Sequence, residues 1–270
     1  MTDSDKIFSG SIPELYDTYL VPMIFEAYAA DLAERVVALK PETVLETAAG
    51  SGVVTRALAA RLNPAARYVV TDLNQPMLDH AASRQGPDDR ITWQQADALE
   101  LPFDDASFDA AVCQFGVMFF PDRVAGYAEA KRVLKPGGRF HFNVWDHIGV
   151  NEIADIVTQT AASIFPGDPP QFLLRTPHGY HDTGAIEEEL HSAGFGNVSV
   201  TTITEESPAP SPRHAAVAYC EGTPLRSEIE ARDASLLEHV TERATQAIAD
   251  QYGNGPIAAK IQAHIFTAGV

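Results

Sequence analysis

Small residues between acidic ones form the most chemically suggestive part of this chain. Glu46 is followed by the small-residue run 47–52, and Asp72 lies 20 positions after the end of that run. Small side chains let a ligand approach main-chain N–H groups, and a carboxylate can accept hydrogen bonds from both hydroxyls of a ribose. We therefore predict a site for a ribose-containing ligand. The alternatives are a tight turn without a ligand and an Asp72 that caps the next helix.

The elements around these residues should place them at one edge of a sheet. The apolar runs predict a strand over 43–46 and a second strand that ends at Asp72, and the amphipathic stretch 53–62 predicts a helix between them. The small residues of the turn that matter most are Ala48, Gly50 and Gly52. Strand, turn, helix and strand in this order are half of a doubly wound α/β sheet, whose ligands bind at the carboxyl ends of the strands.

The same alternation continues and predicts a parallel sheet with an added C-terminal region. Further strands are expected over 91–95, 108–114, 139–145, 198–204 and 261–267, with a turn at 135–138. Helices are expected over 75–83, 124–134, 151–165, 184–193 and most of 211–252, with a loop over 166–182. Helical spacing also marks residues 13–39, where Pro22 predicts two helices or a kink.

Composition and charge exclude several classes of protein. The formal net charge of −18 argues against nucleic acid as a partner, and two cysteines without metal-ligand spacing predict no metal site. The apolar stretch 110–120 is too short to span a bilayer, and residues 1–6 do not resemble a signal peptide. We expect a cytoplasmic protein without stable membrane insertion. Its oligomeric state is not predicted.

We expect a single domain over residues 1–270. Its parts would be an N-terminal helical segment (1–40), a cofactor-binding core (41–146), and a region (147–270) with the remaining strands and a helical cap or insert at about 207–255.

The end of the third predicted strand supplies further candidate contacts. Asp97 can accept a hydrogen bond from an adenine amino group, and the main chain of Ala98 can contact the ring. Leu73 and Met77 would form an apolar slot for the base. The alternatives are an aspartate that bonds its own loop and, for Met77, plain core packing.

The glycine pattern argues against a dinucleotide as the ligand of this turn. Counted from Gly50, the dinucleotide template Gly-x-Gly-x-x-Gly requires glycine at position 55, where Thr55 stands. Counted from Ala48, it fails at its first position and again at Val53. An NAD(P)-dependent oxidoreductase is therefore kept only as an alternative.

Six motifs in order and spacing resemble a known enzyme family. They are the turn 46–52, Asp72-Leu73 with Met77-Leu78, Asp97-Ala98, Leu101-Pro102-Phe103, Ser107-Phe108-Asp109 and Leu134-Lys135-Pro136-Gly137-Gly138. As a set they resemble the class I S-adenosylmethionine (SAM)-dependent methyltransferases, in the small-molecule branch that includes ubiquinone and menaquinone C-methyltransferases. The resemblance covers roughly residues 40–146, and it departs at Ala48, where many relatives carry glycine.

The resemblance implies a fold and a cofactor. The fold would be a Rossmann-like sheet of seven strands, mostly parallel with an antiparallel final strand, plus a helical cap. The cofactor would be SAM and the product S-adenosylhomocysteine. By the same resemblance, Glu46, Gly50 and the turn would hold the methionine part, and Asp72 the ribose. Leu73, Asp97 and Ala98 would hold adenine, and Gln114 would line the methyl region.

The implied reaction is in-line methyl transfer to a small molecule whose nucleophile (O, N or C) stays open. Candidates for the acceptor pocket are the aromatic residues Tyr16, Tyr19, Phe25, Phe115, Phe119 and Trp145. His147 is the candidate base, with a surface histidine as the alternative. A methyltransferase-like partner subunit without activity is the remaining alternative.

Overall fold

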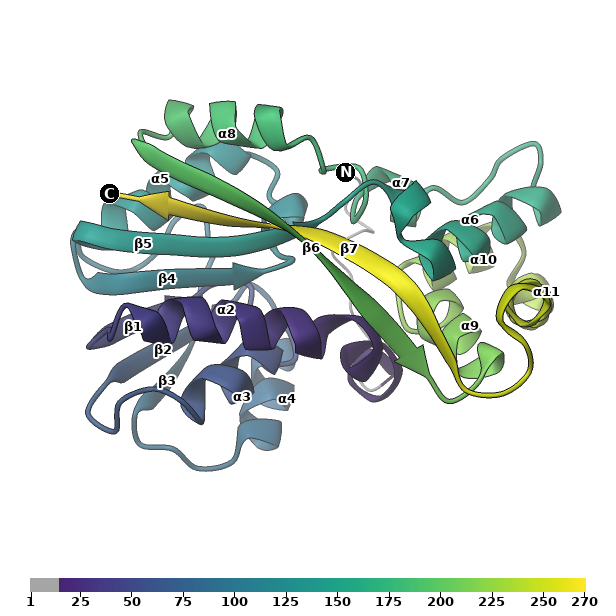
Figure 1. The fold of residues 1–270 in the computed structure, drawn as a ribbon, viewed down its shortest axis with the longest axis horizontal. Helices are drawn as coiled ribbons and strands as arrows, with labels where there is room; N and C mark the ends of the chain where they lie inside the picture. Colours follow the sequence, from purple (N-terminus) through teal and green to yellow (C-terminus); the bar gives the residue numbers. More distant parts are fainter. Residues whose placement is uncertain (1–14) are drawn as a thin grey trace. The chain divides into compact units, whose positions relative to one another are not determined.

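The computed structural model describes residues 15–270 and contains one seven-stranded sheet (Figure 1). The strands are β1 (Thr43–Glu46), β2 (Arg67–Asp72), β3 (Ile91–Gln95), β4 (Phe108–Gln114), β5 (Leu134–Trp145), β6 (Asn197–Ala209) and β7 (Ile257–Gly269). Their order is β3-β2-β1-β4-β5-β7-β6, and the first five pair in parallel. β7 is antiparallel to β5, because Gly137 donates to the carbonyl of Val270 while Asp146 donates to that of Gln262. The predicted seven-stranded fold is confirmed.

The helices before β5 are η2 (Tyr16–Phe25), α2 (Glu26–Ala38), α3 (Val53–Ala59), α4 (Gln75–Gln85), η3 (Val117–Phe119) and α5 (Arg123–Val133). Those after it are η4 (Ile148–Val150), α6 (Glu152–Ile164), α7 (Phe172–Arg175), α8 (Thr183–Ser192), α9 (Pro212–Cys220), α10 (Leu225–Asp233), η5 (Ala234–Leu236) and α11 (Leu237–Tyr252). Pro22 lies inside η2, a π-helical segment, and α2 begins four residues later, so the segment divides into two helical elements but not at the proline. Residues 13 and 14 of that prediction lie outside the described residues.

Several predicted boundaries were wrong at the C-terminal strands. β5 begins at Leu134 rather than at Arg139, because Leu134 already pairs with Phe108 and a register shift follows. The predicted turn 135–138 is therefore part of the strand. β6 continues through Pro208, which an edge strand tolerates because half of its N–H groups face away from the neighbouring strand. The loop expected over 166–182 contains the short helix α7.

The Ser-Phe-Asp motif joins the starting ends of three strands. Asp109 on β4 accepts hydrogen bonds from the main-chain N–H groups of Glu42 and Thr43, at 3.0 and 2.8 Å. Its other oxygen lies 2.7 Å from Nζ of Lys135 on β5. Asp109 and Lys135 therefore link β1, β4 and β5. They lie at the starting ends of these strands, opposite the predicted ligand edge.

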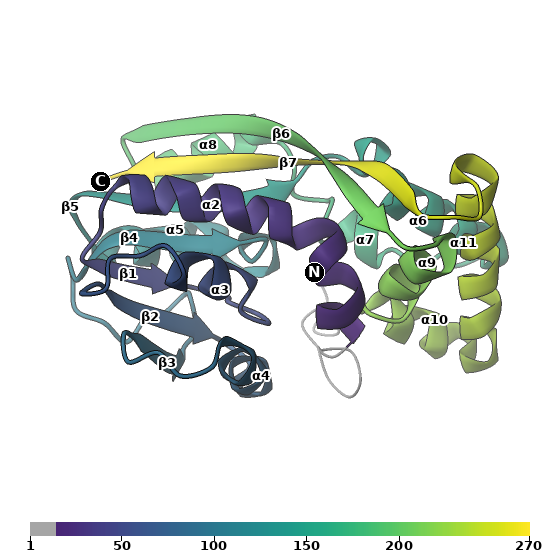
Figure 2. The same ribbon diagram turned by 60° about the horizontal axis from the view of Figure 1, so that its bottom comes forward.

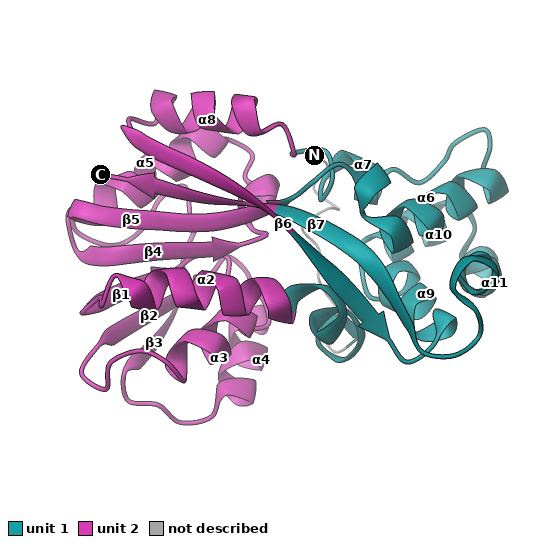
Figure 3. Cartoon of the chain, viewed as in Figure 1, with its two compact units in different colours: residues 1–25, 145–180, 204–263 teal, residues 26–144, 181–203, 264–270 magenta. Residues whose placement is uncertain are grey.

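The chain divides into two compact units, which are described separately (Figure 3). Unit 1 comprises residues 1–25, 145–180 and 204–263, and unit 2 comprises residues 26–144, 181–203 and 264–270.

In unit 2, helices cover both faces of the sheet, with α2 in front and α5 and α8 behind (Figure 2). On β5, Phe140 and Phe142 pack against Tyr127 of α5. His141, between them, points to the other face, where the positive charge of Arg35 on α2 acts on it. This alternation is the period of a strand that is buried on both faces.

In unit 1, helices α6, α9 and α11 pack together. Glu152, the first residue of α6, accepts hydrogen bonds from the Tyr252 hydroxyl at 2.6 Å and from the main-chain N–H of Lys260 at 2.7 Å. One carboxylate thus joins α6, α11 and β7. Within residues 15–270, no helix has the length and apolarity needed to cross a membrane.

Candidate functional site

The turn after β1 has a left-handed backbone at three positions. The φ angles of Ala48, Gly50 and Gly52 are 51°, 56° and 78°. Glycine adopts this region freely, whereas alanine is strained there. A Cβ placed on Gly116, in the loop after β4, would lie 2.6 Å from Cβ of Ala48 and 2.6 Å from Sγ of Cys113. Glycine at 116 therefore lets this loop pack directly against the turn.

Asp72 ties the end of β2 to the same turn. One of its carboxylate oxygens accepts a hydrogen bond from the N–H of Gly50 at 2.8 Å, and the other accepts one from the N–H of Asn74 at 2.8 Å. Burial raises the pKa of Asp72, and these main-chain donors oppose that rise. A carboxylate has about four acceptor sites. The two oxygens therefore retain capacity for further donors such as ribose hydroxyls.

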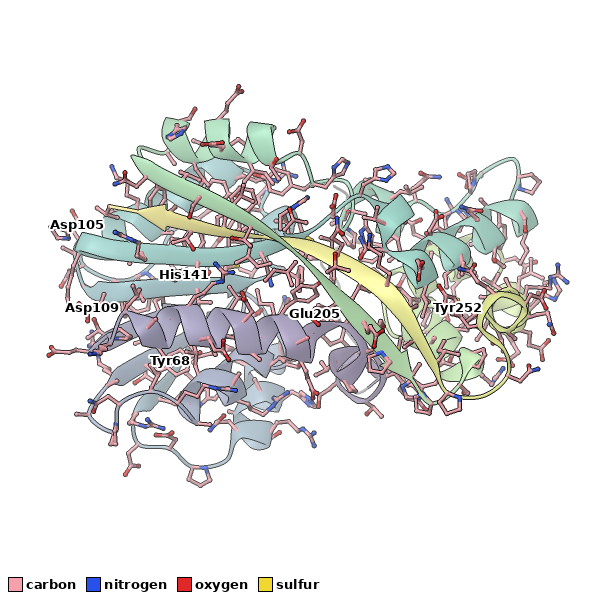
Figure 4. All side chains as sticks on the ribbon, viewed as in Figure 1. Tyr68, Asp105, Asp109, His141, Glu205 and Tyr252 are labelled. Atoms are coloured by element: carbon pink, nitrogen blue, oxygen red, sulfur yellow. The ribbon has the colours of Figure 1, made fainter. Side chains whose placement is uncertain are left out.

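Glu46 points into the protein rather than outward from the turn. Its carboxylate is buried and accepts hydrogen bonds from the Thr55 hydroxyl at 2.7 Å and from the Tyr68 hydroxyl (Tyr68 is labelled in Figure 4). Burial raises the pKa of Glu46 to about 7. The side chain thus braces β1 against β2 and α3 beneath the turn. Neither partner was expected from the sequence, because both contacts depend on how the sheet assembles.

The remaining adenine candidates differ in exposure. Asp97 is exposed and accepts a hydrogen bond from the N–H of Leu99 at 2.9 Å, which is the loop-aspartate alternative of the sequence prediction. Ala98 is half-buried. Leu73 is 47% exposed, whereas Met77 is buried, with its Cε 3.8 Å from a Cβ placed on Gly50.

The end of β4 carries Gln114, Phe115 and, one turn later, the half-buried Phe119 of η3. Gln114 pairs in register with Asn143 of β5. Phe115 has a left-handed φ of 48°, and its N–H donates to Oδ1 of Asn143 at 2.8 Å. Its ring meets that of Tyr28 edge-on, with centroids 5.6 Å apart.

Unit 1 contains a line of ring systems that we call the aromatic row, made of Tyr16, Phe25, Trp145 and His178. The successive centroid distances are 5.1, 6.0 and 6.0 Å. Three of the four were predicted pocket residues. His178 was not, because it lies in a segment without periodicity. Tyr19, also a candidate, instead packs on His214 with centroids 4.6 Å apart.

Two histidines of unit 1 have opposite ring arrangements. His147 is exposed, and its Nδ1 accepts a hydrogen bond from the N–H of Gly149 at 3.1 Å. His178 is 5% exposed, and its Nδ1 lies 2.9 Å from the carbonyl oxygen of Asp146. A carbonyl only accepts, so Nδ1 of His178 carries the hydrogen and Nε2 of the neutral ring carries the lone pair.

A polar network holds this part of unit 1. The Asp146 carboxylate accepts hydrogen bonds from the N–H of His147 and from Nε2 of Gln262, both at 2.6 Å.

Over the described part of the chain, no group of three or more His, Cys, Asp or Glu residues could hold a metal ion.

The turn of unit 2 also contains a buried polar group without a partner in the described chain, the hydroxyl of Ser51. Ser51 is 1% exposed, and its hydroxyl has no hydrogen-bond partner among residues 15–270. A buried hydroxyl without a partner lowers stability, and such groups in native proteins often meet a ligand or water. Together with the left-handed backbone and Asp72, Ser51 fits a polar ligand at the turn. The sequence pattern did not single out Ser51.

Comparisons with known proteins agree on one family. A family model described as a methyltransferase domain matches residues 44–138. The demethylmenaquinone methyltransferase of Clavibacter sepedonicus is 30% identical over 196 residues, covering 65% of this chain and 76% of that protein. The ubiquinone/menaquinone biosynthesis C-methyltransferase UbiE of Caulobacter vibrioides is 29% identical over 180 residues, covering 60% of this chain and 71% of that protein.

Solved structures share the fold. The YcgJ protein of Bacillus subtilis has a TM-score of 0.56 at 18% identity, covering 90% of this chain and 98% of that one. Phosphoethanolamine N-methyltransferase 2 of Haemonchus contortus, in complex with phosphomonomethylethanolamine and S-adenosylhomocysteine, has a TM-score of 0.60 at 18% identity, covering 98% of this chain and 59% of that one.

Proposed function

This chain belongs to the class I SAM-dependent methyltransferases, and we propose that it methylates a small aromatic acceptor of the quinol type. The observation that carries this proposal is the aromatic row of unit 1, whose rings suit a flat apolar ring system. The relatives named for demethylmenaquinone support the same acceptor class. Family membership removes the support for an NAD(P)-dependent oxidoreductase.

SAM supplies the chemistry in the form of a methyl group activated on a sulfonium. The protein must then hold the donor, align the acceptor's nucleophile and exclude water. Asp72 would accept the ribose hydroxyls, using the acceptor capacity that Gly50 and Asn74 leave. The turn's main chain, with Ala48, Gly50 and Gly52, would hold the amino acid end of the cofactor.

The adenine would lie beside Leu73 and Ala98, with Met77 beneath the turn. Asp97 would reach the adenine amino group with the oxygen that does not accept from Leu99. Glu46 would act indirectly, because its carboxylate braces the turn through Thr55 and Tyr68.

Within unit 1, the acceptor would contact the aromatic row, which contains the pocket candidates Tyr16, Phe25 and Trp145. Within unit 2, Phe115 and Phe119 remain candidates at the end of β4, and Gln114 remains the candidate for the methyl region. Tyr19, paired with His214, would border the aromatic row.

A quinol must lose a proton during methylation, so a base is useful. His147 is a base candidate only if its Nδ1 gives up the hydrogen bond from Gly149. Nδ1 of His178 donates to the carbonyl of Asp146, so a neutral His178 would have its lone pair on Nε2 and is a second base candidate.

The function is tested by turnover. We expect purified protein to transfer a labelled methyl group from SAM to 1,4-dihydroxynaphthalene, with formation of S-adenosylhomocysteine, and not to phosphoethanolamine. Mass spectrometry of the product locates the new methyl on carbon or oxygen. No turnover with any aromatic acceptor, despite measurable SAM binding, would favour the alternative of an inactive partner subunit.

The cofactor assignment is tested at Asp72. By calorimetry, Asp72→Ala should weaken S-adenosylhomocysteine binding about tenfold or more, since hydrogen bonds to a charged group contribute about 1.5–3 kcal/mol. Asp97→Ala is the matched control and should have the smaller effect, because Asp97 is exposed. Unchanged affinity in Asp72→Ala would exclude the ribose role.

A further inference from the structure

Asn143 on β5 has an amide group that is only half used. The residue is 0% exposed, and its Oδ1 accepts the hydrogen bond from the N–H of Phe115 at 2.8 Å. That donor fixes the orientation of the amide, because only the oxygen can face an N–H. The Nδ2 group therefore points elsewhere. Within the described part of the chain it has no hydrogen-bond partner, and it is closed to water.

An unpaired amide donor at this position needs an explanation. Leaving a buried donor without a hydrogen-bond acceptor lowers the stability of the folded state. Native proteins contain few such groups, and a ligand or an ordered water accounts for many of them. Phe142 and Val144, next to Asn143 along the strand, point to the opposite face and do not surround it. The hydrogen bond from the Phe115 N–H accounts for Oδ1 of Asn143 and leaves Nδ2 without a partner among the described residues.

The sheet order indicates which ligand the Nδ2 group serves. The cofactor candidates lie at the ends of β1, β2 and β3 and, with Gln114, at the end of β4. β5 is the next strand beyond β4, on the side away from β1. Asn143 is in parallel register with Gln114, so the two side chains share one face of the sheet. Among the predicted contacts, Gln114 was the one assigned to the methyl region, and Asn143 lies one strand further from the ribose.

We propose that Asn143 is a substrate-binding residue, whose Nδ2 donates a hydrogen bond to an oxygen of the methyl acceptor. This inference rests on the proposed function. A quinol carries oxygens directly on its ring, and the charge on such an oxygen grows when its proton leaves. A hydrogen bond to that oxygen strengthens as the charge develops, which favours the reacting form of the acceptor.

The other end of the same amide links the acceptor to the loop after β4. Oδ1 of Asn143 holds the N–H of Phe115, whose left-handed φ of 48° is strained for a bulky residue. One side chain would therefore both contact the acceptor and keep the Phe115 ring in place against Tyr28.

Asn143→Asp separates these two roles. Aspartate keeps an oxygen for the N–H of Phe115 and replaces the Nδ2 donor with a second oxygen. We expect kcat/KM for 1,4-dihydroxynaphthalene to fall about ten- to a hundredfold, the loss that an unsatisfied hydrogen bond in a binding site causes. The dissociation constant of SAM, measured by calorimetry, should stay within about twofold of wild type, because the proposed hydrogen bond is to the acceptor and not to the cofactor.

His141→Gln is the matched control. His141 lies on the same strand and the same face, two residues earlier, and it also has a buried ring nitrogen, Nε2, without a partner among the described residues. Its replacement should alter stability and leave kcat/KM unchanged. A loss of kcat/KM in His141→Gln equal to that in Asn143→Asp would assign the effect to general disturbance of β5 and overturn the proposal.

A measurement on the unmutated protein covers the case in which Asn143→Asp does not fold. With asparagine labelled with nitrogen-15 and S-adenosylhomocysteine bound, the side-chain amide of Asn143 is assigned through its nuclear Overhauser contact with the Phe115 amide proton. Saturating 1,4-dihydroxynaphthalene should shift this amide signal downfield. A shift of other signals with none at Asn143 would overturn the proposal.

The outcomes distinguish this inference from the proposed function. Wild-type turnover that Asn143→Asp leaves unchanged overturns the role of Asn143 and leaves the function standing. A variant that loses SAM affinity while keeping its acceptor KM assigns the donor to the cofactor and overturns the proposal. Absence of wild-type turnover with aromatic acceptors overturns the function, and the Asn143 assignment falls with it.

Discussion

The turn of unit 2 and the aromatic row of unit 1 are built in different ways. The turn uses main-chain conformation and one acid, all within residues 46–72, and three of its φ angles are left-handed. The aromatic row uses side-chain rings from three separate stretches of the chain, 16–25, 145 and 178. A turn with a left-handed backbone requires particular residue types at fixed spacing. The aromatic row requires only large, flat side chains, which many sequences can provide.

This difference explains why the binding site of the methyl donor is easier to predict from a sequence than that of the methyl acceptor. SAM is common to the family, so the turn that would hold it is tied to a local pattern. The acceptor would meet residues that only tertiary structure brings together, as Trp145 and His178 show.

The most damaging change to the turn should be Gly52→Ala. A Cβ there would lie 2.9 Å from Cβ of Ala81, at a φ of 78°. The clash and the strain together should lower the free energy of unfolding by about 2–5 kcal/mol and weaken SAM binding. Gly137→Ala is the matched control, since Gly137 has a φ of 83° and no atom within 4 Å of an added Cβ. Equal losses in a denaturant titration would show that strain alone, and not packing on α4, sets the requirement.

The second prediction concerns two buried ionisable groups of unit 2, Glu46 and His141. Burial raises the pKa of Glu46 from 4.5 to about 7, so the folded state keeps a proton that the unfolded state loses, and stability falls as pH rises through this range. Burial and the charges of Arg35 and Arg139 lower the pKa of His141 from 6.5 to about 4, so stability falls as pH drops. Between pH 4.5 and 6.5 the two contributions oppose each other.

Single variants should uncover these opposing contributions. Relative to wild type, Glu46→Gln should lose an additional ~1.4 kcal/mol of unfolding free energy for each pH unit of acidification in this window, and His141→Gln should gain a similar amount. Urea titrations at several pH values measure both slopes. Curves parallel to wild type would show that neither group titrates there.

In the aromatic row, Trp145→Leu should raise the KM for the aromatic acceptor about tenfold, because ring contacts contribute about 0.5–1.5 kcal/mol beyond their buried area. The affinity for SAM should not change, and calorimetry checks this directly. Tyr219→Leu, a buried unit 1 residue outside the row, is the control and should leave KM unchanged. Loss of SAM affinity in Trp145→Leu would remove the contrast between the two regions.

The smallest effect is expected from Ala48→Gly. Relief of the strain at a φ of 51° is partly offset by the greater freedom of glycine in the unfolded chain. The net gain in unfolding free energy should be at most about 1 kcal/mol, with SAM affinity retained. Ala49→Gly should instead destabilise, because no positive φ is relieved there. A destabilised Ala48→Gly would mean that the alanine methyl contributes packing against Gly116 that outweighs the strain.

The sequence predicted the first part of the fold closely, and physical reasons separate what was readable from what was not. The bounds of β1, β3 and β4 agree with prediction because turn residues flank each strand. The start of β5 was missed because a register shift, and not composition, decides it.

Within the candidate site, Asp72 and the turn were found from local spacing. The burial of Glu46 and the partnership of Asn143 with Phe115 are long-range consequences of assembly. The one local signal for Asn143 was an amide between two apolar neighbours in a strand.

The position of β7 between β5 and β6 has a consequence for synthesis on the ribosome. Within residues 15–270, β6 pairs only with β7, which follows it in the chain. A nascent chain that ends before Ile257 therefore has an open β5 edge and a β6 segment without a partner. Unpaired strand edges are templates for aggregation. Premature termination late in translation should thus yield a product that needs chaperone protection or rapid degradation, although most of the sheet has already been made.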